Sequence, residues 1–151
     1  GFNEAYEYAI KVEVGDGNTI RVSSLAGLAL LKLMAWQDRR YESNKDATDF
    51  LTILTEYANI ELDRLYEDFV PAPALDFVPE RLGAYLLGYD VAMLLGGENS
   101  APTSTKISAL LADQKAALLN SLLKEKRSHQ SEEVTQWLQD FEDGLHKQLL
   151  L

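Results

Sequence analysis

Apolar residues recur along most of the chain at intervals of three and four positions, with polar residues between them. This spacing is typical of amphipathic helices, whose apolar stripe packs against a shared core. Helices are expected over residues 24–40, 45–57, 60–69, 79–95, 106–126 and 132–150. The pattern therefore predicts a mainly α protein of the α+β class, built as a helical bundle of five to six helices.

Two short segments near the N-terminus, Ile10–Val14 and Thr19–Val22, alternate apolar and polar residues instead. A glycine-rich turn separates them, so they are expected to form one small β-hairpin. Two strands alone are marginal in water, so the hairpin must lie against the helices or complete a sheet that is missing from this chain. A dimer formed through an open strand edge of the hairpin is one expected outcome. Residues 1–151 are expected to be a single domain, with 1–23 as the hairpin region and 24–151 as the helical part.

The segment 79–95 is apolar on almost every side, which predicts the central, buried helix of the bundle. Asp90 lies within it, and a buried carboxylate is costly unless it is paired or hydrogen-bonded. We expect Asp90 to be tied to an arginine such as Arg39 or Arg81, in preference to a catalytic role.

Composition narrows the functional classes. The chain has no cysteine, and His129 and His146 lack the spacing of metal ligands, so no metal site is expected. The net charge of −10 argues against a protein that coats nucleic acid with its whole surface. Lys124, Lys126 and Arg127 are interpreted as complementing a helix dipole, in preference to a nucleic-acid patch. The sequence shows no signal peptide and no apolar stretch of membrane-spanning length, so a cytoplasmic protein without a membrane partner is expected.

The stretch from Ser24 to Phe50 concentrates the candidate chemistry. Lys32 and Arg39 lie two helical turns apart and project in nearly the same direction. Asp46 and Asp49 are three residues apart and share a face of the next helix. If the two helices form a hairpin across a short turn, the cations of the first helix meet the acids of the second.

Two interpretations of these four charges are open. In the first, they form a structural ion-pair cluster, with the stem of Lys32 lying along apolar surface. In the second, Lys32 and Arg39 face phosphates, and Asp46 or Asp49 holds them in place. Spacing alone does not decide between an ion-pair cluster and an anion pocket.

The sequence SLAGLALLKLMAWQDRR followed by KDATDF resembles the AbiEii-like nucleotidyltransferases. These are toxin components of abortive-infection and toxin–antitoxin systems, within the polymerase-beta-like nucleotidyltransferase superfamily. The stretches GFNEAYEYAI, YANIELDRLYED and RLGAYLLGYDVA are also similar to the later portion of that family. The resemblance covers roughly residues 1–95.

In such enzymes an N-terminal catalytic half carries a Gly-Ser turn followed by an Asp-x-Asp pair that holds the metal ions. Neither motif occurs in this sequence. The resemblance therefore implies that the chain is the C-terminal portion of such a protein, without its metal-binding half. Because two-metal phosphoryl transfer needs those carboxylates, the chain alone is not expected to catalyse.

The resemblance also implies roles for five residues. Lys32 matches the lysine expected near the triphosphate, with Arg39 and Lys45 as phosphate-binding neighbours. Asp46 or Asp49 matches the catalytic acid of the last motif, which orients that lysine or assists the transfer. Mg²⁺ and a nucleoside triphosphate are expected for the intact protein, and neither cofactor is expected in this chain alone.

The leading hypothesis is a nucleotidyltransferase portion that completes a nucleoside-triphosphate site and helps to grip an RNA acceptor. Its partners are then the missing catalytic half, the nucleotide and RNA. The alternative is a non-catalytic helical module that binds an antitoxin or another protein, in which the charged hairpin is structural. An upstream sequence encoding Gly-Ser and Asp-x-Asp would favour the first hypothesis.

Overall fold

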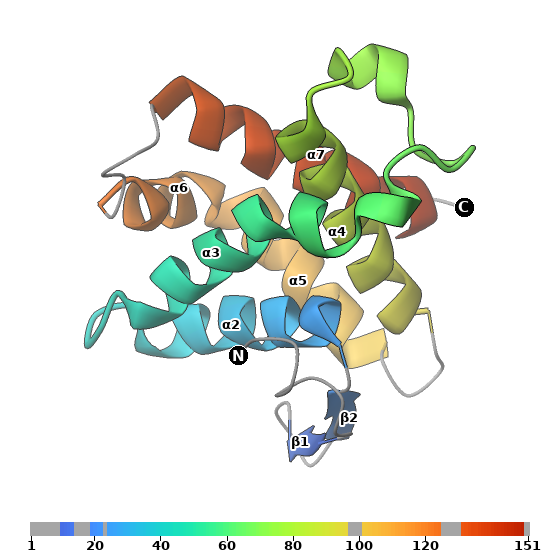
Figure 1. The fold of residues 1–151 in the computed structure, drawn as a ribbon. Helices are drawn as coiled ribbons and strands as arrows, with labels where there is room; N and C mark the ends of the chain where they lie inside the picture. Colours follow the sequence, from blue (N-terminus) through green and yellow to red (C-terminus); the bar gives the residue numbers. More distant parts are fainter. Residues whose placement is uncertain (1–9, 14–18, 23, 97–100, 125–130, 150–151) are drawn as a thin grey trace.

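The computed structural model describes residues 10–13, 19–22, 24–96, 101–124 and 131–149. Within this part the protein is mainly helical, as the sequence pattern predicts, and Figure 1 shows the helices gathered into one body. The helices are α2 (Leu25–Arg39), α3 (Lys45–Ile60), α4 (Pro79–Leu94), α5 (Ala101–Asp113), α6 (Lys115–Leu123) and α7 (Ser131–Leu149). Two short 3₁₀ turns, η1 (Leu62–Arg64) and η2 (Ala72–Leu75), lie between α3 and α4. Among the described residues, no helix is both long and apolar enough to cross a membrane.

Two strands precede α2. β1 (Ile10–Glu13) pairs antiparallel with β2 (Thr19–Val22), with Ile10 opposite Val22. The strand side chains and the connecting turn lie outside the described residues. Which face of the hairpin is covered, and whether its edge completes a sheet or a dimer, therefore stay predictions.

The centre of the fold is the contact between α4 and α7. Every residue from Leu82 to Gly88 is buried, which confirms α4 as the central helix. A Cβ atom added to Gly88 would lie 1.9 Å from the carbonyl oxygen of Phe141, and one added to Gly144 would lie 2.1 Å from that of Tyr85. Two glycines on opposite helices thus let the backbones of α4 and α7 touch.

α2 and α3 pack against each other and against α4. The Ser24 hydroxyl accepts a hydrogen bond from the Gly27 N–H at 3.2 Å and so caps the start of α2. The expected apolar stripe of α3 is buried: Ala47, Phe50, Leu51 and Leu54. Phe50 meets Phe141 edge-to-face, with ring centres 5.3 Å apart, so α3 is fixed against α7 as well.

The helix expected over 60–69 is wrong. The α3 helix continues to Ile60, and only the η1 turn follows. Leu62 and Tyr66 are 62% and 60% exposed, whereas Leu65 is buried. Leu65 fills the core while Arg64 reaches Asp90 on α4, so tertiary contacts fix the path of this segment in place of a further helix.

The single helix expected over 106–126 is also wrong. It is divided into α5 and α6 at Gln114, whose φ of −124° and ψ of 15° lie outside the helical region. The Gln114 side chain accepts a hydrogen bond from Gln37 on α2 at 3.4 Å, which anchors the break against the bundle. α5 also begins at Ala101, before the expected start.

Candidate functional site

A short turn folds α3 back along α2. The carbonyl oxygen of Arg39 accepts hydrogen bonds from the N–H groups of Glu42 at 2.9 Å and Ser43 at 3.1 Å. The Asn44 side chain donates to the carbonyl oxygen of Ser121 at 3.0 Å, which fastens the turn to α6. The turn therefore has the geometry needed to bring the charges of the two helices together.

The two cations of α2 meet the two acids of α3, and we call Lys32, Arg39, Asp46 and Asp49 the α2–α3 cluster. The Lys32 ammonium lies 2.8 Å from Asp49 Oδ2 and 3.6 Å from Asp46 Oδ1. The Arg39 Nη2 group donates to both carboxylate oxygens of Asp46, at 2.9 and 3.0 Å. The convergence expected from the residue spacing is confirmed.

Burial differs across the α2–α3 cluster. The Asp46 side chain is 4% exposed and receives both cations, which compensate its loss of hydration. The Lys32 side chain is 22% exposed, while those of Asp49 and Arg39 are more accessible. The buried Asp46 carboxylate therefore fixes the Lys32 ammonium group, which stays partly accessible to solvent. Because the four formal charges cancel, an anion reaches Lys32 only by displacing a carboxylate.

Lys45 is not part of this geometry. Its side chain is exposed, and its backbone N–H donates to Ser43 Oγ at 3.1 Å. Within the described part of the chain, its ammonium group forms no ion pair. The structure thus brings together four of the five site residues expected from the sequence.

Asp90 on α4 is bound by Arg64 and Tyr57. Arg64 Nη1 and Nη2 donate to its two carboxylate oxygens at 2.8 and 2.9 Å, and the Tyr57 hydroxyl donates to Oδ2. The expectation of an arginine partner is confirmed, but naming Arg39 or Arg81 for that role is wrong. Burial, with the Asp90 charge second, raises the pKa of Tyr57. The hydrogen bond to Asp90 raises the pKa of Arg64. Both oxygens of the Asp90 carboxylate thus accept hydrogen bonds, and the bonds from Arg64 fix η1 against α4.

A second buried pair was missed by the sequence analysis. Arg81 on α4 donates from Nε and Nη2 to the buried carboxylate of Asp140 on α7, at 2.9 and 3.1 Å. Gln136 donates to the same carboxylate at 3.0 Å. The hydrogen bond with Asp140 raises the pKa of Arg81. The signal that could have revealed the pair is an acid in the apolar stripe between Trp137 and Phe141.

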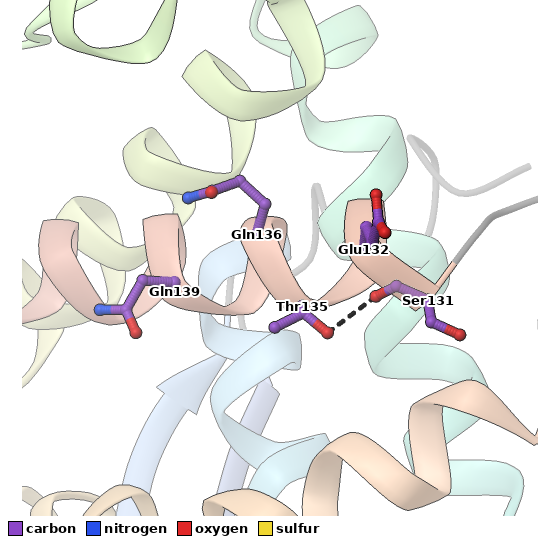
Figure 2. Close-up of a pocket in the computed structure, with 5 residues that line it drawn as sticks. All are labelled: Ser131, Glu132, Thr135, Gln136 and Gln139. Atoms are coloured by element: carbon purple, nitrogen blue, oxygen red, sulfur yellow. Dashed lines mark hydrogen bonds between the residues drawn. The ribbon is translucent and has the colours of Figure 1, made fainter.

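Two surface hollows lie elsewhere, on α7. One, of about 400 Å³, is lined by Ser131, Glu132, Thr135, Gln136 and Gln139. Figure 2 shows that these side chains come from a single helix and do not converge, with Gln136 and Thr135 directed to opposite sides. The other, of about 250 Å³, lies where α4 and α7 begin. Neither hollow includes a residue of the α2–α3 cluster.

Among the residues that the structure describes, no three His, Cys, Asp or Glu side chains are grouped so that they could hold a metal ion.

Comparison with protein-family models, curated proteins and solved structures found no match. The resemblance to AbiEii-like nucleotidyltransferases therefore rests on motif residues alone, chiefly those of α2 and α3.

Proposed function

We propose that this chain is the C-terminal, helical portion of a cytoplasmic nucleotidyltransferase of the toxin–antitoxin type, in which the α2–α3 cluster lies beside the triphosphate of the nucleotide. The observation that supports this proposal is the position of Lys32, which is partly exposed and braced by two carboxylates. The buried Asp46 fixes this cation before the substrate arrives, so only Asp49 has to move for Lys32 to stabilise phosphate charge.

The cluster suits this role through the unequal burial of its acids. Asp46 is buried and keeps Arg39 and Lys32 in place, while Asp49 is half-exposed and can turn to water. A phosphate group then replaces Asp49 as the partner of Lys32, and charge-assisted hydrogen bonds to Lys32 and Arg39 hold it. Mg²⁺, held by the Asp-x-Asp carboxylates of the catalytic half, would neutralise the transferring phosphoryl group.

A second candidate function is favoured by the charge balance of the cluster. Both cations already have carboxylate partners, so the four residues also suffice as a clamp between α2 and α3. In that case the chain is a non-catalytic helical module that binds a protein partner. The two candidates differ in what Lys32 does for turnover.

The test compares Lys32→Ala with Lys115→Ala in the full-length protein that includes the catalytic half. Lys115 is a matched control, because its side chain is 33% exposed and pairs with Glu142 on a neighbouring helix. Transfer of labelled nucleotide to RNA is measured together with urea unfolding. Lys32→Ala is expected to raise KM for nucleotide and lower kcat, with kcat/KM reduced about tenfold or more.

Lys115→Ala removes a partly exposed ion pair and is expected to change the free energy of unfolding by about 1 kcal/mol or less. Lys32→Ala removes the ion pairs to Asp49 and Asp46, but Arg39 still holds the buried Asp46 carboxylate, so its effect on the free energy of unfolding should be about 1–2 kcal/mol. Lys115→Ala should leave both kinetic constants unchanged. If KM and kcat are also unchanged in Lys32→Ala, the nucleotidyltransferase role of the cluster is refuted and the helical module remains.

A further inference from the structure

We propose that the end of the molecule formed by the α2–α3 turn and the C-terminal end of α6 binds a single strand of nucleic acid. Tyr41 stacks on a base, Lys45 and Lys124 contact backbone phosphates, and Arg40 holds the Tyr41 ring in position. We call these four residues the basic end. The inference rests on the proposed function for RNA as the strand, but it is tested by binding and needs no turnover.

Two hydrogen bonds bring the parts of the basic end together. The Trp36 indole N–H donates to Ser121 Oγ at 2.9 Å, and the Asn44 amide donates to the Ser121 carbonyl oxygen at 3.0 Å. Lys124 follows Ser121 by three residues, about one turn of helix. Figure 1 shows the α2–α3 turn and the end of α6 on the same side of the molecule. Residues about 80 positions apart in the chain are thus neighbours.

The Tyr41 ring is exposed and held in one position, so it can stack on a base. It is 87% exposed, the most exposed of the large apolar side chains in the described residues. The Arg40 guanidinium carbon lies 4.9 Å from the centre of the Tyr41 ring, and Nη2 donates to the Tyr41 hydroxyl at 2.8 Å. The same guanidinium lies 5.0 Å from the centre of the buried Trp36 ring. The tyrosine is therefore held in position while most of its ring faces water, ready to stack on any base.

The accessible charges of the basic end are those of Lys45 and Lys124, whose side chains are exposed, whereas Arg40 has Nη1 buried and Nη2 directed to the Tyr41 hydroxyl. Within the described part of the chain, Arg40, Lys45 and Lys124 form no ion pair. The other cations of the helical body include five that carboxylates already hold: Lys32, Arg39, Arg64, Arg81 and Lys115. Asp38 and Glu42 are exposed in or beside the turn, so the three cations of the basic end leave an excess of one positive charge. On a chain of net charge −10, this local excess is the place where a polyanion is attracted.

An exposed aromatic ring beside cations that form no ion pair within the described residues distinguishes a single strand from other polyanions. A duplex keeps its bases stacked inside and offers only phosphates, and an anionic membrane likewise offers no ring for Tyr41 to stack on. Both should bind weakly and without dependence on Tyr41.

The experiment measures binding of this chain to a fluorescein-labelled single-stranded RNA of about ten nucleotides by anisotropy, in salt from about 50 to 200 mM. Tyr41→Ala is expected to weaken binding about tenfold, the usual effect of losing one stacked base. Lys45→Ala should weaken binding and reduce the slope of log K against log salt by about 0.7. Tyr66→Ala is the control, because this tyrosine is also mostly exposed but lies in an acidic segment.

Support for the proposal is loss of affinity in Tyr41→Ala and Lys45→Ala but not in Tyr66→Ala. The proposal is overturned if the RNA does not bind at low salt, or if all three variants bind as tightly as the unmodified chain. It is equally overturned if a duplex of the same length, or vesicles of phosphatidylserine, bind as well as the single strand. Failure here leaves the Lys32 turnover test unaffected, so the two ideas fail separately.

Discussion

At the scale of single residues, three aspartates are bound in the same way, each by one arginine. Asp46, Asp90 and Asp140 are each gripped through both carboxylate oxygens by an arginine from another part of the chain. The planar guanidinium matches both oxygens at once, which lysine does not. Each pair joins two elements: α2 to α3, η1 to α4, and α4 to α7. The arginines therefore set the relative positions of the helices, while the apolar core supplies most of the burial.

The Tyr57–Asp90 hydrogen bond gives a pH-dependent prediction. The raised pKa of Tyr57 means that the folded protein keeps a proton that the unfolded chain loses above pH 10.0, the ordinary value for tyrosine. The resulting stabilisation is fully present below that pH and is lost as the pH rises above it. Between about pH 9 and pH 11, the free energy of unfolding should fall by about 1 kcal/mol more in the unmodified chain than in Tyr57→Phe.

Urea unfolding at several pH values measures this difference. Tyr57→Phe should also be less stable at neutral pH by about 1–2 kcal/mol, since it loses a hydrogen bond to a charged carboxylate. Other tyrosines titrate in both proteins and cancel in the comparison. Parallel curves for the two proteins above pH 10 would contradict the assignment of the buried proton to Tyr57.

Residue-scale prediction succeeded where two charges are linked by a short turn and failed where they are not. Lys32, Arg39 and Asp46 meet because one helical hairpin fixes their relation, and the spacing alone contains that information. The need of Asp90 for a partner also followed from its apolar neighbours. The identity of that partner, Arg64, did not, because it lies in a segment without helical period whose path depends on the core.

At the scale of elements, the packing of α4 on α7 depends on glycines that hydrophobic periodicity does not single out. Gly88 and Gly144 face the backbone of the opposite helix, and their importance depends on the register between helices far apart in the sequence. Similarly, the break at Gln114 and the loss of the helix over 60–69 arise from tertiary contacts that override local pattern. The four long helices α2, α3, α4 and α7 were predictable from the pattern, but the path of the chain after α3, the division at Gln114 and the close approaches were not.

Substitution of these glycines tests the close approach. Gly88→Ala is expected to destabilise the protein by about 3 kcal/mol or more, since its Cβ would need the space of a backbone carbonyl oxygen, 1.9 Å away. Gly96→Ala is the control, because the nearest atom to its Cβ lies at 3.4 Å and the residue is exposed. It should change stability by about 1 kcal/mol or less. Thermal unfolding followed by circular dichroism measures both, and equal losses in the two variants would refute the tight α4–α7 contact.

At the scale of the whole molecule, charge is distributed unevenly. The segment between α3 and α4 is rich in acids, with Arg64 as its one cation, whereas Arg40 and Lys45 at the α2–α3 turn form no ion pair with the residues that the structure describes. The α2–α3 cluster itself is neutral, with two cations and two acids. The net charge alone could be counted from the sequence, but its separation into an acidic side and a basic end required the fold, because α6 completes the basic end from a distant part of the chain.

The last prediction concerns nucleotide binding by this chain alone. A neutral cluster on a protein of net charge −10 should repel a nucleoside triphosphate, so the dissociation constant for ATP with Mg²⁺ should be weaker than about 1 mM by calorimetry. Asp49→Asn frees Lys32 from its nearest acid and is expected to tighten binding measurably. Asp68→Asn removes the same charge at an exposed site outside the cluster, so it should have little effect. Micromolar binding by the unmodified chain, or equal gains in the two variants, would show that the balance of charge around Lys32 does not control access of the phosphate.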